Sequence, residues 1–300
     1  MEHKKIYGFM VLASICWAGA FIAGKYSVPY IPVFTLTFLR FFFAGILLCG
    51  VMRVSHNTYR LQKAHLPVFL LTGTVGMFGY HILFFSALNY TTAINASIIA
   101  AMNPTTTVIL AYAFLRQKLN RLQAFGVVLS FVGVFLTITG ADLDIIKSLS
   151  VNKGDLLMFA AVIFWAIYSI VSSKATRNEA DASAEIPPMA LTFYSFVVCL
   201  ILLIPFVIWE KPQEFIFELP AGVWMAVLYM SIFPSVIGYL IQQLSIKEIG
   251  PGRTSIFINL VPVFSVVLAV LLLGEELAPI KLFTGALIII GVIITQKGRA

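Results

Sequence analysis

Charged residues are scarce in this chain. Only 11% of its 300 residues are Asp, Glu, Lys or Arg, against about 25% in soluble globular proteins, while 60% are hydrophobic. A soluble protein of this length needs a polar coat around its core, and this composition does not supply one. The surplus apolar surface therefore faces lipid, which excludes a soluble globular domain. No polar stretch between the apolar runs is long enough to form a separate soluble domain.

Residues that bind metals or form disulfides are also few. Cys16, Cys49 and Cys199 each lie inside an apolar run, their number is odd, and their spacing matches no metal site. Three of the four histidines lie outside the apolar runs, which leaves His81 at membrane depth. We therefore expect no metal and no cofactor, and we interpret the cysteines as small core residues.

The net charge of +7 does not indicate a nucleic-acid partner, because the basic residues are scattered through short connections and form no stripe. In a membrane protein, an excess of Lys and Arg marks the cytoplasmic connections instead. If the N-terminus is cytoplasmic, most basic residues fall on the inside. The outside segments then hold only Lys25, Lys147, Lys153, Lys211 and Lys281. This asymmetry predicts cytoplasmic N- and C-termini and an even number of spans.

Apolar stretches that can cross a bilayer recur along the whole chain. One crossing helix needs about 20 residues. We predict ten spans, at residues 6–28, 32–52, 66–88, 93–115, 122–140, 155–175, 187–209, 219–243, 253–273 and 280–296. The connections between them are mostly short and contain Pro, Gly and charged residues. The expected fold is an all-α integral membrane protein with ten transmembrane helices.

The two halves of the chain resemble each other. Ile-Cys-Trp-Ala at 15–18 parallels Ile-Phe-Trp-Ala at 163–166, and Leu-Thr-Phe occurs at 36–38 and again at 191–193. Further matches follow in the same order: Gly79-Tyr80 with Gly238-Tyr239, Ser97 with Ser255, and Pro104 with Pro262. Because each half has five spans, an odd number, the second half enters the membrane upside down. Inverted repeats of this kind are typical of alternating-access carriers with a site near the midplane.

We assign residues 1–140 to the first five-helix repeat, 141–154 to a connecting loop and 155–300 to the second, inverted repeat. Short motifs recur within them. They are Trp17-Ala18 with the small residues Gly19, Ala20, Ala23 and Gly24, Ala-Met-Asn-Pro at 101–104, Asn-Leu-Val-Pro at 259–262, Gly274-Glu275-Glu276, and the region 285–291. In this order they resemble the drug/metabolite transporter superfamily, in particular EamA-type permeases with two EamA domains, over nearly the whole chain.

The first half departs from this pattern, because Arg116-Gln117-Lys118 stands where the second half has its acidic motif. The resemblance implies a bacterial inner-membrane protein that exports or takes up amino acids, related metabolites or drugs. It does not choose among these substrates, because one fold serves many functions.

Arg40 is the most informative single residue, because it lies about 12 Å into the second predicted span at 1.5 Å per residue. A charge at this depth costs at least about 2.5 kcal/mol, so the side chain should face the protein interior or a water-filled cavity. It could bind a substrate carboxylate there, or it could snorkel to the interface or bond other helices. The equivalent position of the second half is Ser195, which weakens the substrate interpretation.

His81, in the third predicted span, can carry a proton near neutral pH or be a neutral imidazole bonded to a neighbouring helix. No Asp or Glu lies in the middle of a predicted span, which argues against a carboxylate proton relay and leaves the coupling ion open. Pro104, Pro234 and Pro262 interrupt three predicted spans. Proline frees a carbonyl one turn earlier, and that group needs a side chain, water or ligand. The paired prolines predict kinked helices that line a cavity, with a passive packing kink as the alternative.

The candidate substrate-binding residues are polar and aromatic side chains at membrane depth. Trp17 and Trp165 lie deeper than an interfacial belt and at matching repeat positions, which favours a place in the cavity. The polar residues, taken singly, are more often contacts between helices than ligands of a substrate. We predict the substrate site from Trp17, Arg40, Tyr80, His81, Asn95, Asn103, Trp165, Tyr168, Tyr239, Gln242 and Asn259.

We expect a secondary transporter of small metabolites, amino acids or related compounds, with export favoured, that works by alternating access between the repeats. A multidrug or hydrophobic-cation exporter of the same fold is the alternative. A membrane-embedded enzyme is disfavoured because no convergent nucleophiles, paired acids or metal ligands occur at membrane depth. The short connections disfavour a receptor, and the paired broken helices disfavour a channel. The expected partners are a small-molecule substrate and the lipid bilayer, and the sequence is compatible with a homodimer.

Overall fold

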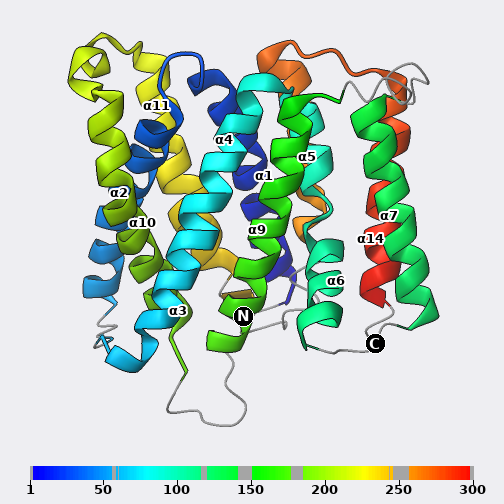
Figure 1. Cartoon of the computed structure of the whole chain (residues 1–300), viewed down its shortest axis with the longest axis horizontal. Coiled ribbons are helices and arrows are strands. Elements are labelled where there is room, and N and C mark those ends of the chain that lie inside the picture. The colour runs from blue at the N-terminus through cyan, green and yellow to red at the C-terminus, as the bar shows by residue number, and fades with distance from the viewer. Residues whose placement is uncertain are drawn as a thin grey trace.

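The computed structural model describes residues 3–55, 59, 61–115, 120–140, 151–176, 185–242, 244–245 and 257–297. In this part of the chain all regular structure is helical, and the long helices lie side by side in one bundle (Figure 1). Nine helices among these residues are long and apolar enough to cross a membrane, and Leu260–Leu273 forms a shorter apolar helix. The prediction of an all-α membrane protein is confirmed. A helix suits lipid because it satisfies its own backbone hydrogen bonds.

The first repeat contains five spans. They are α1 (His3–Ser27), α2 (Val33–Val54), the continuous series η1 (Lys63–His65), α3 (Leu66–Leu71), η2 (Thr72–Gly79) and α4 (Tyr80–Tyr90), the pair α5 (Ala93–Ala100) and α6 (Asn103–Leu115), and α7 (Arg121–Thr139). Local signals set several of these ends. Asn120 and Gln123 form a reciprocal capping box at the start of α7, and Gly140, in a left-handed conformation with φ of 62°, ends it.

The second repeat follows the same order. Its elements are α9 (Lys153–Thr176), α10 (Pro188–Glu210), the short turns η4 (Pro212–Glu214) and η5 (Ile216–Glu218), α11 (Ala221–Ile232) with η6 (Phe233–Ile237), α13 (Leu260–Leu268) with η7 (Ala269–Leu273), and α14 (Pro279–Lys297). The eighth span continues through η6 to Gln242. The predicted ninth span, 253–273, falls within the described residues only from 257 onward.

The two repeats interdigitate. The first helix of each repeat packs against the third and fourth spans of the other: α1 against α11 and α13, and α9 against α4, α5 and α6. Helix α10 packs in the same crossed manner against α2 and η2. Helices α7 and α14 pair with each other at one edge of the bundle (Figure 1). The start of α1 and the end of α14 lie at the same end of the bundle, as an even number of spans requires (Figure 1).

Helical irregularities occur at equivalent places of the two repeats. The third and eighth spans each contain a π-helical turn, η2 and η6. The fourth span is broken between α5 and α6, and the ninth has a turn at Asn259 immediately before α13. Such turns interrupt the regular ladder of backbone hydrogen bonds and are frequent at functional sites. Residues of η6 and of the breaks in the fourth and ninth spans line one cavity between the repeats, and η2 ends immediately before Tyr80, which also lines it.

Candidate functional site

A cavity of about 410 Å³ lies between the two repeats. Helices of both repeats line it, including α1, α2, α4 and the α5–α6 break from the first, and α9, α10 and η6 from the second. The cavity extends to Ser173, Thr176 and Pro188, where α9 ends and α10 begins. Ser173 is exposed, so the cavity reaches the surface there. We call this the mouth end of the bundle.

At its opposite limit the cavity stops at Phe21 and Phe84. Their rings meet edge to face with centroids 5.0 Å apart. Beyond them, Phe85 and Leu88 are fully buried in the hydrophobic core. We call this the closed end. Within the part of the chain that the structure describes, the cavity is therefore open on one side and sealed on the other by packed aromatic side chains.

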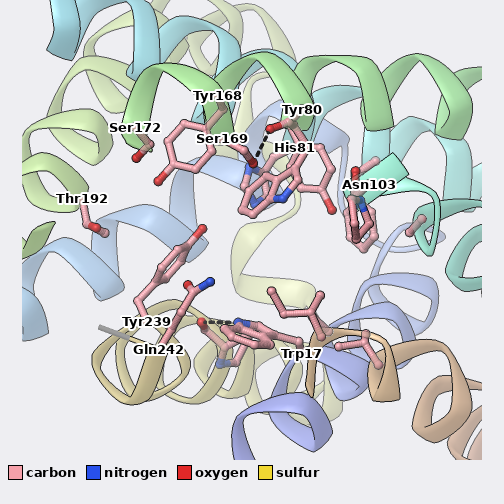
Figure 2. A pocket seen from close by; sticks show the side chains of 18 of the residues that line it. Trp17, Tyr80, His81, Asn103, Tyr168, Ser169, Ser172, Thr192, Tyr239 and Gln242 are labelled. Carbon is pink, nitrogen blue, oxygen red and sulfur yellow. Dashed lines mark hydrogen bonds between the residues drawn. The ribbon is translucent and has the colours of Figure 1, made fainter. Parts of the chain in front are cut away.

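Aromatic rings form two facing walls of the cavity (Figure 2). Trp17 and Tyr239 lie on one side, and Tyr80 and Tyr168 lie on the other. The ring of Trp165 belongs to the second wall, with centroids 4.7 Å from Tyr80 and 5.0 Å from Tyr168. Each wall combines a helix of the first repeat with one of the second, at matching repeat positions. The walls offer flat, largely apolar surfaces with hydroxyl groups at their edges.

The indole of Trp17 is held in place by the irregular eighth span. Its Nε1 donates a hydrogen bond of 3.2 Å to the carbonyl of Pro234, which lies in η6 (Figure 2). Gly238 lies so close that a Cβ atom there would be 2.8 Å from the same nitrogen. The predicted kink residue Pro234 thus provides a backbone acceptor to a cavity residue, and the absence of a side chain at Gly238 allows the approach.

Arg40 is buried, with 6% of its surface exposed, and its side chain reaches the cavity from α2. Its Nε donates to the hydroxyl of Ser235 at 3.0 Å, and the guanidinium carbon lies 5.6 Å from the ring of Phe41. No carboxylate among the described residues lies within ion-pair distance of it. Its electrostatic neighbours are the phenols of Tyr80 and Tyr239. The cavity therefore contains a cation that lacks a protein counter-ion in the described part of the chain.

His81 is 3% exposed and lines the cavity beside Tyr80. Its Nδ1 donates to the carbonyl of Met77 at 2.9 Å, and its ring meets the Phe41 ring edge to face at 4.7 Å. The bond to a carbonyl requires a proton on Nδ1, which leaves Nε2 as an acceptor when the ring is neutral. His81 is therefore bonded within its own span and packs against α2 through Phe41, and a proton-carrying role stays a prediction.

The breaks in the fourth and ninth spans border the cavity directly. Asn103 and Pro104 begin α6 after the two-residue turn that ends α5, and both line the cavity. Asn259 and Pro262 line it from the equivalent break before α13. The Asn259 side chain lies within hydrogen-bond distance of Gln296, with Nδ2 3.4 Å from Oε1. The predicted proline pair therefore lies at two matched breaks around one space.

The structure brings most of the predicted site residues together. Those that line the cavity are Trp17, Arg40, Tyr80, His81, Asn103, Trp165, Tyr168, Tyr239, Gln242 and Asn259. Asn95 does not line it: its Nδ2 lies 3.3 Å from the carboxylate of Asp155, towards the closed end. Substrate contact by any of these residues stays a prediction. Among the described residues, no group of three His, Cys, Asp or Glu could hold a metal ion.

Sequence reasoning missed the hydroxyl groups near the mouth. Ser169, Ser172, Ser173 and Thr176 line the cavity from one face of α9, and Thr192 faces them from α10 (Figure 2). Together with Trp165 and Tyr168 they recur at spacings of three and four residues, the period of a single helix face. This spacing is the signal that could have identified them. The face changes from aromatic in the interior to hydroxyl-bearing at the mouth.

Comparisons with known proteins agree with this geometry. The profile described as the EamA-like transporter family matches residues 4–139 and again 152–296. The uncharacterized transporter YyaM of Bacillus subtilis is 31% identical, with 99% of this chain and 95% of that protein covered. An uncharacterized transporter of Archaeoglobus fulgidus is 29% identical, with 98% of both chains covered.

Two more distant similarities are to a protein with a named substrate class and to a solved structure. The probable terminal-alkyne amino-acid exporter of Streptantibioticus cattleyicolor is 24% identical, with 99% of this chain and 95% of that protein covered. A crystal structure with 21% sequence identity superimposes with a TM-score of 0.62 over 97% of both chains. At that identity the likeness concerns the fold, and it supports the two-repeat architecture.

Proposed function

Since the chain belongs to the EamA-like transporter family, whose members move small molecules across membranes, we propose that it carries amino acids or related carboxylates by alternating access. In this proposal the cavity between the repeats is the substrate site, and the described conformation is open at the mouth end. The crossed packing of the repeats supports it, because rocking one against the other would close the mouth and open the opposite end.

The observation that carries the proposal is Arg40. Its buried guanidinium has no carboxylate partner among the residues that the structure describes, which is costly in a membrane protein unless something compensates the charge. A substrate carboxylate would supply that charge and could bind the planar guanidinium through paired hydrogen bonds. Ser235 occupies Nε, and the terminal nitrogens are the ones we assign to the substrate.

The walls suggest what the rest of the substrate looks like. Trp17 and Trp165 face the space from matching positions of the two repeats, with phenols beside them. Rings pack well against apolar or aromatic groups and also attract cations over their faces. An amino acid with an apolar side chain suits both features, because its ammonium group can lie against a ring while its carboxylate reaches Arg40.

An exporter of hydrophobic cations is the competing function. Such a site would need an acidic residue to balance the cargo, and none of the described lining residues is Asp or Glu. The charge of Arg40 would repel a cation in this low-dielectric space. The cavity thus favours a carboxylate over a cation.

Orientation and direction complete the proposal. Basic residues are concentrated at the mouth end of the bundle, so we assign that end to the cytoplasm of a bacterial cell, with both termini there. A cavity that is open to the cytoplasm can load substrate from inside. Export is the direction we propose, and the similarity to a protein named as an amino-acid exporter supports it.

The proposal is tested with the purified protein in liposomes. Four ligands that share one ring but differ in charge are compared: phenylalanine, 3-phenylpropionate, phenethylamine and phenylalaninamide. We expect saturable counterflow of labelled phenylalanine, competed by 3-phenylpropionate but not by the two amines. A thermal-shift assay in detergent should rank the ligands in the same order, because a ligand of the folded state raises its stability.

The control is the same preparation with Arg40→Gln, which keeps a polar side chain of moderate size but removes the charge. It should fold normally and lose the preference for carboxylates. Binding of phenethylamine in preference to both carboxylates by the wild-type protein would reverse the assignment in favour of the cation exporter. Flux that rises linearly with concentration, without saturation, would argue for a channel.

A further inference from the structure

Three carboxylates of the second repeat bind the first repeat at the closed end, and none of them lines the cavity. Asp155, in the first turn of α9, is the most deeply buried, with 1% of its surface exposed. Its Oδ1 accepts a hydrogen bond of 2.5 Å from the hydroxyl of Thr91, in the turn between α4 and α5. Its Oδ2 lies 3.3 Å from Nδ2 of Asn95. Asp155 thereby ties α9 to the other repeat.

Glu275, which follows η7, binds the same region from another side. Its two carboxylate oxygens accept from the backbone N–H groups of Ala93 at 2.7 Å and Ile94 at 3.0 Å. These are among the first N–H groups of α5, which have no partner within their own helix. A carboxylate in this position also meets the positive end of the helix dipole. Glu275 thus caps a first-repeat helix from the second repeat.

Glu210, at the end of α10, makes the equivalent contact with α2. Its Oε1 accepts from the N–H of Phe34 at 3.2 Å, and its Oε2 accepts from the N–H of Thr35 at 2.7 Å. The Thr35 hydroxyl also donates to Oε2, at 2.6 Å. Two helix starts of the first repeat and one of its turns are therefore each held by an acid of the second.

One of the basic residues at this end bonds within a single repeat. Lys25 belongs to the first repeat, and its ammonium donates to the carbonyls of Leu88 at 2.7 Å and Thr91 at 2.8 Å, in the same repeat. If the two repeats separate at this end, Lys25 keeps its bonds while Asp155, Glu210 and Glu275 lose theirs. Asn152 and Lys153 of the second repeat also contact Tyr90 of the first at this end, through a bond to its carbonyl at 3.0 Å and a cation–ring contact at 4.7 Å. The bonds to the three carboxylates are charge-assisted, and such bonds are stronger than neutral ones.

We propose that Asp155, Glu210 and Glu275 form the latch that keeps this side of the transporter shut, and that its opening is the transition to the oppositely open state. The inference rests on the proposed alternating-access function, since a static protein needs no latch. The aromatic plug of Phe21 and Phe84 lies between the cavity and the latch and excludes substrate. The carboxylates hold the plugged repeats together.

Distance measurements between spin labels test the latch. In a chain with all three native cysteines replaced, one label is placed at Asn89 of α4 and the other at Gln213, between α10 and α11. Both positions are exposed and lie at the closed end, one on each repeat. We expect a short-distance population to dominate in the ligand-free wild type. Asp155→Asn, Glu210→Gln or Glu275→Gln should each increase the long-distance population at least threefold.

Glu276→Gln is the matched control, because it neutralises the exposed neighbour of Glu275 at the same end. It should leave the distance distribution unchanged. Thr91→Ala removes the Asp155 contact from the other repeat and should shift the distribution in the same direction as Asp155→Asn. This second variant also keeps the test valid if one acidic variant does not fold, which a melting curve would reveal.

The latch proposal is overturned if the variants of all three acids fold and each shows the same distance distribution as the wild type and as Glu276→Gln. The measurement needs no substrate, so it is separable from the proposed function. If the label distances change as expected but no carboxylate is transported, the latch stands and the substrate assignment fails. If carboxylates are transported and the distances do not change, the transport proposal stands and the latch is wrong.

Discussion

Arg40 of α2 donates from Nε to the hydroxyl of Ser235 at 3.0 Å, and Ser235 lies inside the π-helical turn of the opposite repeat. Ser235 in turn donates to the carbonyl of Met230 at 2.8 Å, five residues earlier. A comparable bridge joins the repeats elsewhere, where the hydroxyls of Thr72 in η2 and Ser195 in α10 lie 2.7 Å apart. The same frame thus occurs twice, but only one copy carries a charge. Of these residues, Arg40 is the one that lines the cavity.

Removing that charge should weaken carboxylate binding without unfolding the protein. We expect Arg40→Gln to raise the dissociation constant for a carboxylate about ten- to a hundredfold, because a hydrogen bond to a charged group contributes about 1.5–3 kcal/mol. Arg40→Lys should lie between the two, since an ammonium keeps the charge but loses the planar pair of donors. Thermal shift with a series of carboxylates measures both affinity and folding.

Ser235→Ala tests the orientation of the Arg40 guanidinium separately from its charge. It keeps the guanidinium but removes the hydroxyl that orients it. We expect a smaller loss of affinity than for Arg40→Gln, and an unchanged preference for carboxylates over amines. If Arg40→Gln, Arg40→Lys and Ser235→Ala all melt at the normal temperature and bind carboxylates as tightly as the wild type, Arg40 does not belong to the substrate site.

Gly76 should be needed for the close packing of the third and sixth spans. A Cβ atom there would lie 2.2 Å from the ring of Tyr168, so the Tyr168 ring or the helices must move. Overpacking of this kind costs about 1–3 kcal/mol, and we expect Gly76→Ala to lower the melting temperature. Gly45→Ala is the control, because nothing lies within 4 Å of its added methyl group. A Gly76→Ala protein as stable as Gly45→Ala would show that Tyr168 moves at no cost.

The indoles of Trp17 and Trp165 should determine which substrate side chains the cavity accepts. We expect Trp17→Ala and Trp165→Ala each to reduce affinity for ring-bearing carboxylates about tenfold and to affect small carboxylates less, because aromatic contacts favour ring-shaped groups. Trp17→Phe should keep most of this preference although it loses the bond to Pro234. Trp209→Ala, which removes a tryptophan that is 76% exposed, is the control and should match wild type. Wild-type selectivity in both alanine variants would make the indoles packing residues.

Much of the fold could be predicted from sequence, since lipid imposes simple rules. The length of each apolar run and the odd number of spans in each half led to the ten-helix, two-repeat architecture, which is confirmed. The π-helical turns η2 and η6 could not be predicted in this way. Within η2, Gly73 packs against Val198 and Gly76 against Tyr168, and a π turn depends on which side chains of other spans fill the space beside it.

Site residues could be predicted from the sequence where the residue type is unusual inside a membrane span. Arg40, Trp17 and Trp165 stood out because charge and paired indoles are rare inside a span. Asp155 did not, because its place at the start of a span is typical of interfacial charges, and only the folded chain brings it against Thr91. The sequence does not show that Asn95 lies beside Asp155 either. Asn95 is therefore among the predicted substrate-binding residues, although its partner in the structure is Asp155.

The last prediction concerns which side of the membrane the mouth faces. Arg53, Lys63 and Lys174 lie at the mouth end, and positive residues favour the cytoplasmic side. In a chain without native cysteines, single cysteines are introduced at Ser55 on the mouth end and Gln213 on the closed end, both exposed. We expect a membrane-impermeant maleimide to label Gln213→Cys in intact cells and Ser55→Cys only after permeabilisation. The reverse pattern would place the mouth outside, so that the described conformation would load substrate for uptake and the export proposal would fail.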